Sequence, residues 1–329
     1  MIIRAPIALS CGDPSGIGPE LAPLARQALG RDVPFFYIGD TAHLPKDTSF
    51  QVIERPSQAL DVAAATLPVL LHPFAAPALY GKPNPANADA IISAIKRGVD
   101  LVVSGAASAL CTLPINKKAL KDGAAFAFPG HTEYLSHLAG GRAAVMMLAA
   151  PALRVVPVTI HIPLSDVPVA LTPDLLRKTI TITHAALIRD FGLPAPRLAV
   201  AGLNPHAGEG GTMGRAELDM IIPVLSDLRA AGIDISGPLP ADTMFHARAR
   251  AAYDVAICMY HDQALIPIKT IDFDGGVNVT LGLPFVRTSP DHGTAYDIAG
   301  RGVARADSLI AALRMAQDMA DKRGTNGHA

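Results

Sequence analysis

The chain has 329 residues, of which 50% are hydrophobic and 17% charged, and its formal net charge is −1. This length predicts about two domains, and the high hydrophobicity with few charges excludes a disordered chain. The near-zero charge offers no basic field, so we expect neither nucleic acid nor a membrane as a partner. No secretory signal and no run of about 18 apolar residues is present. The three widely spaced cysteines, Cys11, Cys111 and Cys258, fit a reducing cytoplasm without disulfides.

Short apolar runs alternate with longer helical patterns along the chain. The apolar runs are continuous, which is typical of strands buried on both faces of a largely parallel sheet, so the pattern predicts an α/β layered fold. In chain order, the expected elements are strand 3–10, helix 19–29, strand 35–38, helix 84–97, strand 101–104, helix 132–138, strand 153–160, helix 173–190, strand 197–203, helix 215–231, strand 254–260 and helix 305–321.

Three histidines occupy equivalent places in this pattern. His161, His206 and His261 each lie at or just past the end of an expected buried strand. Ligands of open parallel sheets bind outside the carboxyl ends of the strands, so these imidazoles could converge on one divalent metal. The alternative is three ordinary histidines of the core or loops without a metal, because no local His or Cys ligand motif accompanies them.

Several segments could bind an anion. His131 and Thr132 precede a helical pattern, and Thr132 could cap that helix and leave backbone N–H groups facing an anion. Lys269, Asn278 and Arg287 follow the third histidine, and apolar residues flank both cations. Arg287 could clamp a phosphate or carboxylate through two hydrogen bonds, whereas a solvated lysine and a surface arginine are the alternative.

Glycine-rich loops provide a further signal. The segment GDPSGIGPE follows a strand and opens a helix without matching a Walker A or Rossmann fingerprint, and NPHAGEGGTMG is a long loop between a strand and a helix. Loops of this length are usually functional. The stretch 273–300 mixes Gly, Asn, Arg, Asp and His and has few helical signals.

These motifs together resemble one enzyme family. GDPSGIGPE, PGHTEYL, GLNPHAGEGGTMG, PADT, MYHDQ and GGVNVTLGLPFVRTSPDHGTAYDIAGRG are similar, in the same order, to segments of the 4-hydroxythreonine-4-phosphate dehydrogenase (PdxA) family of vitamin B6 biosynthesis. The last motif also resembles a loop of isopropylmalate and isocitrate dehydrogenases. The resemblance implies their fold, with two α/β/α lobes around a central cleft and an obligate homodimer. The expected lobes are 1–125 plus 275–329 on the cofactor side, and 126–274 for metal, substrate and dimer contacts.

The resemblance also implies roles for individual residues. One divalent metal, Zn²⁺, Mg²⁺ or Co²⁺, is expected on the three histidines, one of them supplied by the partner subunit at a shared active site. Substrate-binding residues are expected at His131, Thr132, Lys269, Asn278 and Arg287, and Asp242 stands where the family has an acidic active-site residue. Asp242 and Lys117 are candidates for the general base, and a metal-acidified alcohol that releases its proton to water is the alternative. The cofactor NAD is expected against His292, Gly293, Ala295 and Asp297, where the carboxylate of Asp297 would accept from the ribose and repel the extra phosphate of NADP.

The activity implied is a metal-dependent, NAD-linked oxidation and decarboxylation. Its substrate, 4-phosphohydroxy-L-threonine, is a small phosphorylated hydroxy-amino acid, and its product is 3-amino-2-oxopropyl phosphate, a precursor of pyridoxal 5'-phosphate. Three alternatives stay open: a dehydrogenase of 4-phospho-D-threonate or 4-phospho-D-erythronate, an aromatic dihydrodiol dehydrogenase, and a phosphotransacetylase-like acyl transferase. The sequence departs from the more usual family pattern at Cys111–Pro114, so this segment leaves the substrate open.

Overall fold

The computed structural model describes residues 5–326 and divides the chain into two compact units. The first unit contains the described residues up to Ala143 together with Leu283–Asp321, and the second contains Ala144–Gly282 and the described residues from Lys322 onward. The first two residues of the expected strand 3–10, Ile3 and Arg4, lie outside the described residues.

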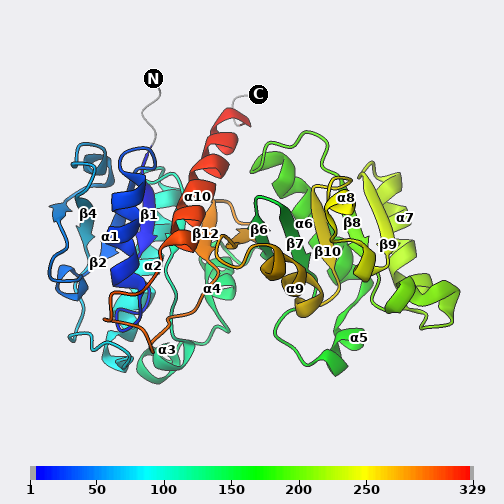
Figure 1. Cartoon of the computed structure of the whole chain (residues 1–329), viewed down its shortest axis with the longest axis horizontal. Helices are drawn as coiled ribbons and strands as arrows, with labels where there is room; N and C mark the ends of the chain where they lie inside the picture. The colour runs from blue at the N-terminus through cyan, green and yellow to red at the C-terminus, as the bar shows by residue number, and fades with distance from the viewer. Residues whose placement is uncertain (1–4, 327–329) are drawn as a thin grey trace. The chain divides into compact units, whose positions relative to one another are not determined.

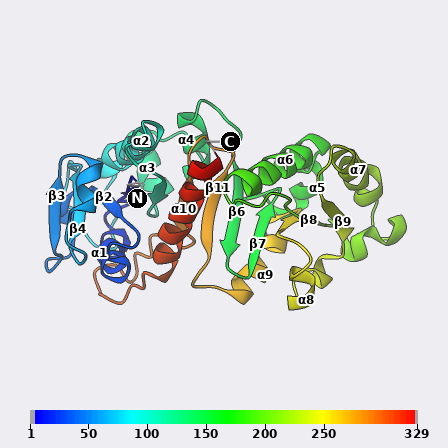
Figure 2. The ribbon, with the colours of Figure 1, turned by 90° about the horizontal axis from the view of Figure 1, so that it is seen from above.

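The first unit is built on parallel strands in the order β3-β4-β2-β1-β5-β12. Helices α1 and α2 cover opposite faces of this sheet (Figures 1 and 2). Strands β1 and β2 are buried along their whole length, as the continuous apolar runs predicted. The elements are β1 Ile7–Ser10, α1 Gly18–Leu29, β2 Phe35–Gly39, β3 Phe50–Ile53, β4 Leu67–Leu71, α2 Ala88–Val103, β5 Leu110–Thr112, α3 Lys117–Ala124, α4 His131–Leu138, β12 Arg287–Pro290 and α10 Asp307–Asn326, whose last residues belong to the second unit.

The second unit has the strand order β11-β6-β7-β10-β8-β9. Neighbours from β7 to β9 are parallel, whereas β6 is antiparallel to both β7 and β11. Helices α6 and α7 lie on one face of this sheet and α9 lies on the other (Figure 2). The elements are β6 Val145–Ala150, β7 Leu153–Pro157, α5 Val167–Ala170, α6 Pro173–Arg189, β8 Leu198–Ala201, α7 Ile222–Ala230, β9 Ile235–Leu239, α8 Ala247–Arg250, β10 Val255–Cys258, α9 His261–Ile271 and β11 Val277–Leu281.

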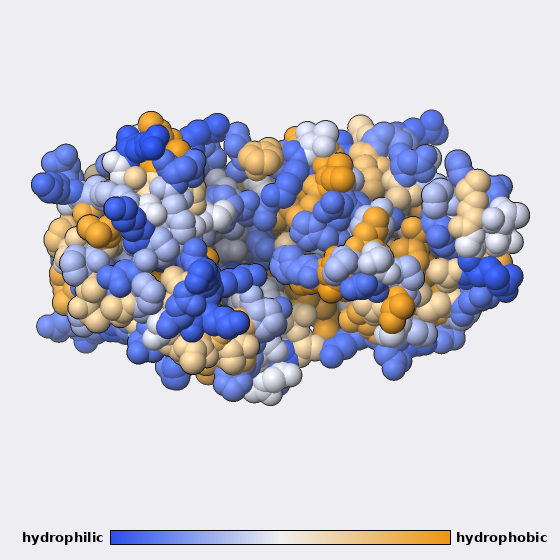
Figure 3. Space-filling model, turned by 90° about the horizontal axis from the view of Figure 1, so that it is seen from below, coloured by the Kyte–Doolittle hydropathy of each residue, from blue (hydrophilic) through white to orange (hydrophobic). Residues whose placement is uncertain are grey.

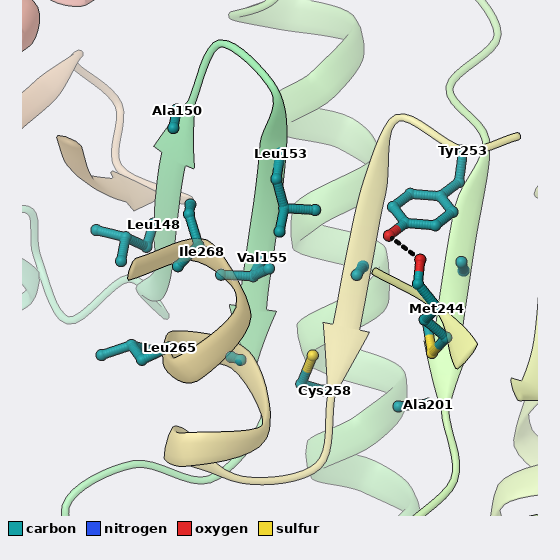
Figure 4. Packing of buried hydrophobic residues seen from close by; sticks show 13 residues of the cluster. Leu148, Ala150, Leu153, Val155, Ala201, Met244, Tyr253, Cys258, Leu265 and Ile268 are labelled. Carbon is teal, nitrogen blue, oxygen red and sulfur yellow. Dashed lines mark hydrogen bonds between the residues drawn. The ribbon is translucent and has the colours of Figure 1, made fainter. Parts of the chain in front are cut away.

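A hydrophobic cluster fixes α9 on the sheet of the second unit (Figure 4). Leu265 and Ile268 of the helix pack over Leu148 and Val155 of the strands beneath. At the far side of the cluster, the Tyr253 hydroxyl donates a 2.9 Å hydrogen bond to a backbone carbonyl, so its polar end is satisfied within the core. Because α9 starts directly after β10, this packing fixes the place where the helix begins.

The structure corrects one predicted element. Residues 101–104 are not a strand: Leu101, Val102 and Val103 form the last turn of α2, and the strand of this region is β5, at Leu110–Thr112. A short apolar run can belong to a strand or a helix, and here the helical spacing continues from the preceding turns. Strands β3, β4, β5, β6, β9, β11 and β12 were not predicted. The predicted α/β class with a largely parallel sheet is confirmed.

The surface mixes apolar and polar side chains on the side from which Figure 3 is viewed. The exposed large apolar residues of the second unit include Leu164 and Val169, which are 68% and 83% exposed. Among the described residues, every helix is too short or too polar to cross a bilayer.

Candidate active site

Neighbouring strands of the second unit carry the three predicted histidines. His161 follows β7, His261 is the first residue of α9 after β10, and His206 lies in the 3₁₀ segment Pro205–Gly211 after β8. Because β7, β10 and β8 are adjacent and parallel, their carboxyl ends meet at one edge of the sheet. The structure therefore brings the three histidine-bearing segments to the same edge.

Two of these histidines lie together in a pocket. The ring centroids of His161 and His261 are 5.8 Å apart, and both residues line a cavity of about 340 Å³ together with Tyr260 and Asp262. Nδ1 of His261 hydrogen-bonds the Asp262 carboxylate at 2.7 Å, which favours the tautomer with its proton on Nδ1 and leaves Nε2 as an acceptor. Protein-bound metals commonly have imidazole ligands oriented in this way.

His206 is exposed and stands on an unusual backbone. The residues from His206 to Gly210 all have positive φ, between 41° and 80°, although three of them are not glycine. Within residues 5–326, no three His, Cys, Asp or Glu side chains are grouped closely enough to hold a metal ion. The pair of His161 and His261 thus fits a metal chemically, but within one chain the three predicted ligands do not form a complete site.

Arg287 is the central cation of the first unit. It opens β12 next to β5, is 3% exposed, and donates from Nη2 to the Thr112 hydroxyl at 2.7 Å. Burial lowers the pKa of the guanidinium from 12.5 to about 10, because the charged form loses its hydration. A cation held at this cost is a candidate for contact with an anionic ligand.

His131 lies in the electrostatic field of two cations. Burial lowers its pKa well below 6.5, and the positive charges of Arg287 and Lys117 lower the pKa further. Its Nε2 atom is buried without a hydrogen-bond partner among the described residues. A neutral imidazole with an unsatisfied nitrogen in the field of two cations is suited to hydrogen-bond a polar or anionic ligand.

The helix that starts at His131 leaves its first N–H groups available. Its N-cap is Gly130, and no side chain caps it, so the prediction that Thr132 caps this helix is wrong. Thr132 is instead the second helical residue and is half-buried. A Cβ atom added at Gly130 would lie 3.4 Å from both Nζ of Lys117 and Oε2 of Glu133, which places an ammonium group and a carboxylate at the helix N-terminus. Both the helix dipole and the lysine favour a negative charge there.

The remaining predicted residues of the second unit lie in different elements. Lys269 is in the last turn of α9, with Nζ 5.5 Å from the centre of the Phe273 ring. Asn278 lies in β11 opposite Leu148 of β6 and is half-buried. Asp242 is exposed in the 3₁₀ segment Ala241–Thr243.

The loop predicted to bind the cofactor is open on one side. Nε2 of His292 is buried without a hydrogen-bond partner in the described part of the chain. Asp297 is exposed, and a Cβ atom added at Gly293 would meet no atom within 4 Å. Ala295 has the left-handed φ of 46°. A polar ligand that accepts from or donates to His292 would satisfy its buried nitrogen.

Two buried carboxylates that we did not predict hold this loop from behind. Tyr296 donates to Oδ2 of Asp13 at 2.6 Å, and Glu20 accepts from the backbone N–H groups of Gly300 and Gly302 at 2.5 and 3.3 Å. Both acids belong to GDPSGIGPE, which therefore contacts the loop 294–302 rather than standing alone as a ligand loop. The only sequence signal for this contact was the presence of acidic residues inside a buried glycine-rich segment. The partners of these acids could not be predicted, because they lie more than 270 positions away in the sequence.

The chain has extensive similarity to known proteins. The family model of the pyridoxal phosphate biosynthetic protein PdxA matches residues 32–316. The 4-hydroxythreonine-4-phosphate dehydrogenase of Roseobacter denitrificans is 64% identical over 317 residues, which cover 96% of this chain and 97% of that protein. The enzyme of the same name from Paracoccus denitrificans is 63% identical over 322 residues, covering 97% and 98%.

A solved structure agrees with these relatives. The crystal structure of 4-hydroxythreonine-4-phosphate dehydrogenase from Klebsiella pneumoniae matches with a TM-score of 0.87 and 36% identity, covering 96% of this chain and 100% of that one. The fold and the site define an α/β protein of the oxidoreductase class. More particularly, the chain belongs to the PdxA family of pyridoxal phosphate biosynthetic proteins, so the resemblance seen in its motifs is confirmed.

Proposed function

We propose that the protein is a 4-hydroxythreonine-4-phosphate dehydrogenase. It oxidises and decarboxylates 4-phosphohydroxy-L-threonine to 3-amino-2-oxopropyl phosphate, with NAD as the electron acceptor, in the biosynthesis of pyridoxal 5'-phosphate. Family membership and the names of the relatives support this activity. The observation that carries the substrate assignment is the buried Arg287 beside His131 and Lys117, because a doubly charged phosphate needs such a group of donors.

The cationic group of the first unit holds an anionic part of the substrate. Arg287 provides the guanidinium, Lys117 a point charge, and the first turn of α4 free N–H groups at His131 and Thr132. Lys269 and Asn278, which lie in the second unit, keep their predicted role as substrate-binding residues. Arg287 is the first residue of β12 and His131 is the first residue of α4. The anion is therefore recognised by residues on regular secondary structure, which holds their side chains more precisely than a loop would.

A divalent metal, Zn²⁺, Mg²⁺ or Co²⁺, is bound by His161, His206 and His261. When bound, it supplies Lewis-acid polarisation of the substrate oxygen and of the ketone that follows. Asp262 orients His261 through the 2.7 Å hydrogen bond at Nδ1. Because only His161 and His261 lie together within the described chain, we infer that the ligand set is completed across a homodimer interface.

The candidates for the general base that takes a proton from the substrate are Asp242 and Lys117. Lys117 is close to His131, whose low pKa keeps the imidazole neutral and able to share a proton with the substrate. Asp242 is exposed and able to exchange its proton with water. His292, Gly293, Ala295 and Asp297 would hold NAD, with the Asp297 carboxylate accepting hydrogen bonds from the hydroxyls of the adenosine ribose.

The two units divide these tasks. The first unit contains the loop 292–300 and serves the cofactor, and the second contains the three histidines and serves the metal and the dimer. Exposed apolar side chains such as Leu164 and Val169, close in sequence to His161, support an interface on the second unit. The buried free thiols of Cys11, Cys111 and Cys258 support a cytoplasmic location.

The deciding experiment measures NADH formation with three substrates. We expect turnover of 4-phosphohydroxy-L-threonine in the presence of a divalent metal, and much slower turnover of 4-phospho-D-threonate and 4-phospho-D-erythronate. Faster turnover of either sugar acid, or of an aromatic dihydrodiol, would replace the substrate assignment. Acyl transfer without NADH formation would contradict the reaction class. Loss of bound metal in His206→Ala and His261→Ala tests the ligand set, and full metal content in both variants would refute it.

A further inference from the structure

A half-buried amide connects two of the histidine-bearing segments. Gln263, in the first turn of α9, accepts a 2.6 Å hydrogen bond from the backbone N–H of Met259 at Oε1. Its Nε2 group donates to the carbonyl of Gly202 at 2.8 Å. Met259 lies two residues before His261, and Gly202 lies at the end of β8, just before the loop of His206. One side chain therefore sets the distance between the backbones that precede these two histidines.

A buried carboxylate holds the loop of His206 in a similar way. Glu217 is 1% exposed and stands at the start of the π-helical turn Glu217–Ile221. Its Oε1 accepts from the backbone N–H of Asn204 at 2.8 Å, and its Oε2 accepts from Nδ2 of the same residue at 2.9 Å. Single-turn π-helices often occur at functional sites. Both oxygens of this acid are thus used to hold the residue two positions before His206.

The surrounding glycines leave room for this carboxylate. A Cβ atom at Gly202 would lie 3.1 Å from Oε1 of Glu217, and one at Gly208 would lie 2.6 Å from Oε2. Gly208 also has a φ of 80°, which a residue with a side chain rarely adopts. Close approach to the Glu217 carboxylate therefore accounts for Gly208 and, together with the backbone of Ala207 at 2.8 Å, for Gly202.

The loop that these contacts hold has an unfavourable backbone. His206, Ala207 and Glu209 are left-handed at φ of 51°, 50° and 41°, a conformation in which the Cβ atom crowds the following carbonyl. A run of such residues persists only where the surroundings impose it. Glu217, through Asn204, is the buried polar contact that restrains the start of this run.

We propose that Glu217 and Gln263 are positioning residues that fix the backbones leading into His206 and His261, two of the proposed ligands, before a divalent metal binds. They act through Asn204, Gly202 and Met259 and do not touch the metal. This inference rests on the proposed metal site. It predicts that the loop of His206 is held in its left-handed form before any metal binds.

Exchanging the donor and acceptor groups of Asn204 and Glu217 tests the contact between these two residues. In Glu217→Gln, the new amide has only one acceptor oxygen for the two donors of Asn204, which are its backbone N–H and Nδ2. In Asn204→Asp, two carboxylates face each other and repel. In the double variant Asn204→Asp with Glu217→Gln, the new amide accepts from the backbone N–H and donates to the new carboxylate, so both hydrogen bonds and the net charge return. Asp219→Asn is the matched control, because this exposed acid lies two residues on and pairs with Arg215.

The readouts are Co²⁺ affinity of the full chain, from the visible spectrum with Co²⁺ alone, and hydrogen exchange of residues 202–214 without metal. We expect each single variant to bind Co²⁺ about 10- to 100-fold more weakly and to exchange faster in this segment. The double variant and Asp219→Asn should stay within about threefold of the original affinity. Gln263→Glu, which keeps the acceptor and loses the donor, should weaken Co²⁺ binding as well.

The outcomes separate this inference from the proposed function. Single variants that bind Co²⁺ and exchange like the original protein would overturn the inference, as would a double variant no better than either single one. If the original protein binds no Co²⁺, the metal site is refuted and the positioning role falls with it, whatever the exchange data show. Loss of Co²⁺ affinity in Glu217→Gln with recovery in the double variant supports the proposal.

Discussion

Replacing Arg287 by methionine should abolish substrate binding without unfolding the protein. The side chain is 3% exposed, and its Nη2 group is 2.7 Å from the Thr112 hydroxyl. Methionine fills a similar volume without the charge, so a phosphate would lose its only guanidinium among the residues assigned here to the substrate. Arg287→Lys keeps the charge but loses the planar fork, which makes it the conservative comparison.

The expected magnitudes follow from the burial of the charge. Hydrogen bonds to a charged group contribute about 1.5–3 kcal/mol, so kcat/KM should fall by about 10- to 100-fold in Arg287→Lys and further in Arg287→Met. The decrease of the pKa from 12.5 to about 10 corresponds to about 3 kcal/mol against folding at every pH below about 10. Removing the charge recovers this energy, while losing the Thr112 hydrogen bond costs about 1–3 kcal/mol. The free energy of unfolding should therefore change little.

Steady-state kinetics, thermal unfolding and NMR titration of His131 together test this reasoning. The pKa of His131 should rise in Arg287→Met, because the Arg287 charge is one cause of its low value. Thr112→Val is the control: it removes the hydroxyl partner but keeps the guanidinium, so the pKa of His131 should stay low. Unchanged kcat/KM together with a large loss of thermal stability would show that Arg287 serves the fold, and the substrate assignment would then fail.

Three further predictions concern other parts of the chain. Asp297→Asn should lower the preference for NAD over NADP in kcat/KM by at least several-fold, and a ratio that does not move would reject Asp297 as the discriminating residue. Glu20→Gln should weaken NADH binding, measured by fluorescence, by about threefold to tenfold with little change in the KM of the substrate, because the loop 298–302 loses one acceptor; equal losses for both ligands would contradict this. Burial acts to raise the pKa of Asp190, but hydrogen bonds from two arginines outweigh it and leave the pKa below 3.8. Its stabilising effect is thus present above pH 3.8 and lost as the pH falls through the lowered pKa, so Asp190→Asn should cost about 2 kcal/mol at pH 7 and progressively less below pH 3.8, as urea unfolding at several pH values would show.

The pattern of the sequence was sufficient for the five strands of the most continuous apolar runs and for the place of the histidines. Continuous apolar runs marked β1, β2, β7, β8 and β10, because strands buried on both faces leave no polar positions. His161, His206 and His261 could be placed after strands for the same reason. The pattern failed at residues 101–104, where an apolar run continues a helix. Local spacing does not separate these two cases when a run is only a few residues long.

Only the tertiary structure decided which of these groups meet. Arg287 contacts Thr112 because β12 pairs with β5, although 175 positions separate the two residues. Glu20 contacts the backbone at Gly300 across 280 positions, and Gln263 contacts Gly202 because β8 and β10 are neighbours. Strand order brings such partners together, and no short stretch of sequence encodes it. The pKa values of His131 and Arg287 follow from the same cause, because burial and neighbouring charges exist only once the sheets have formed.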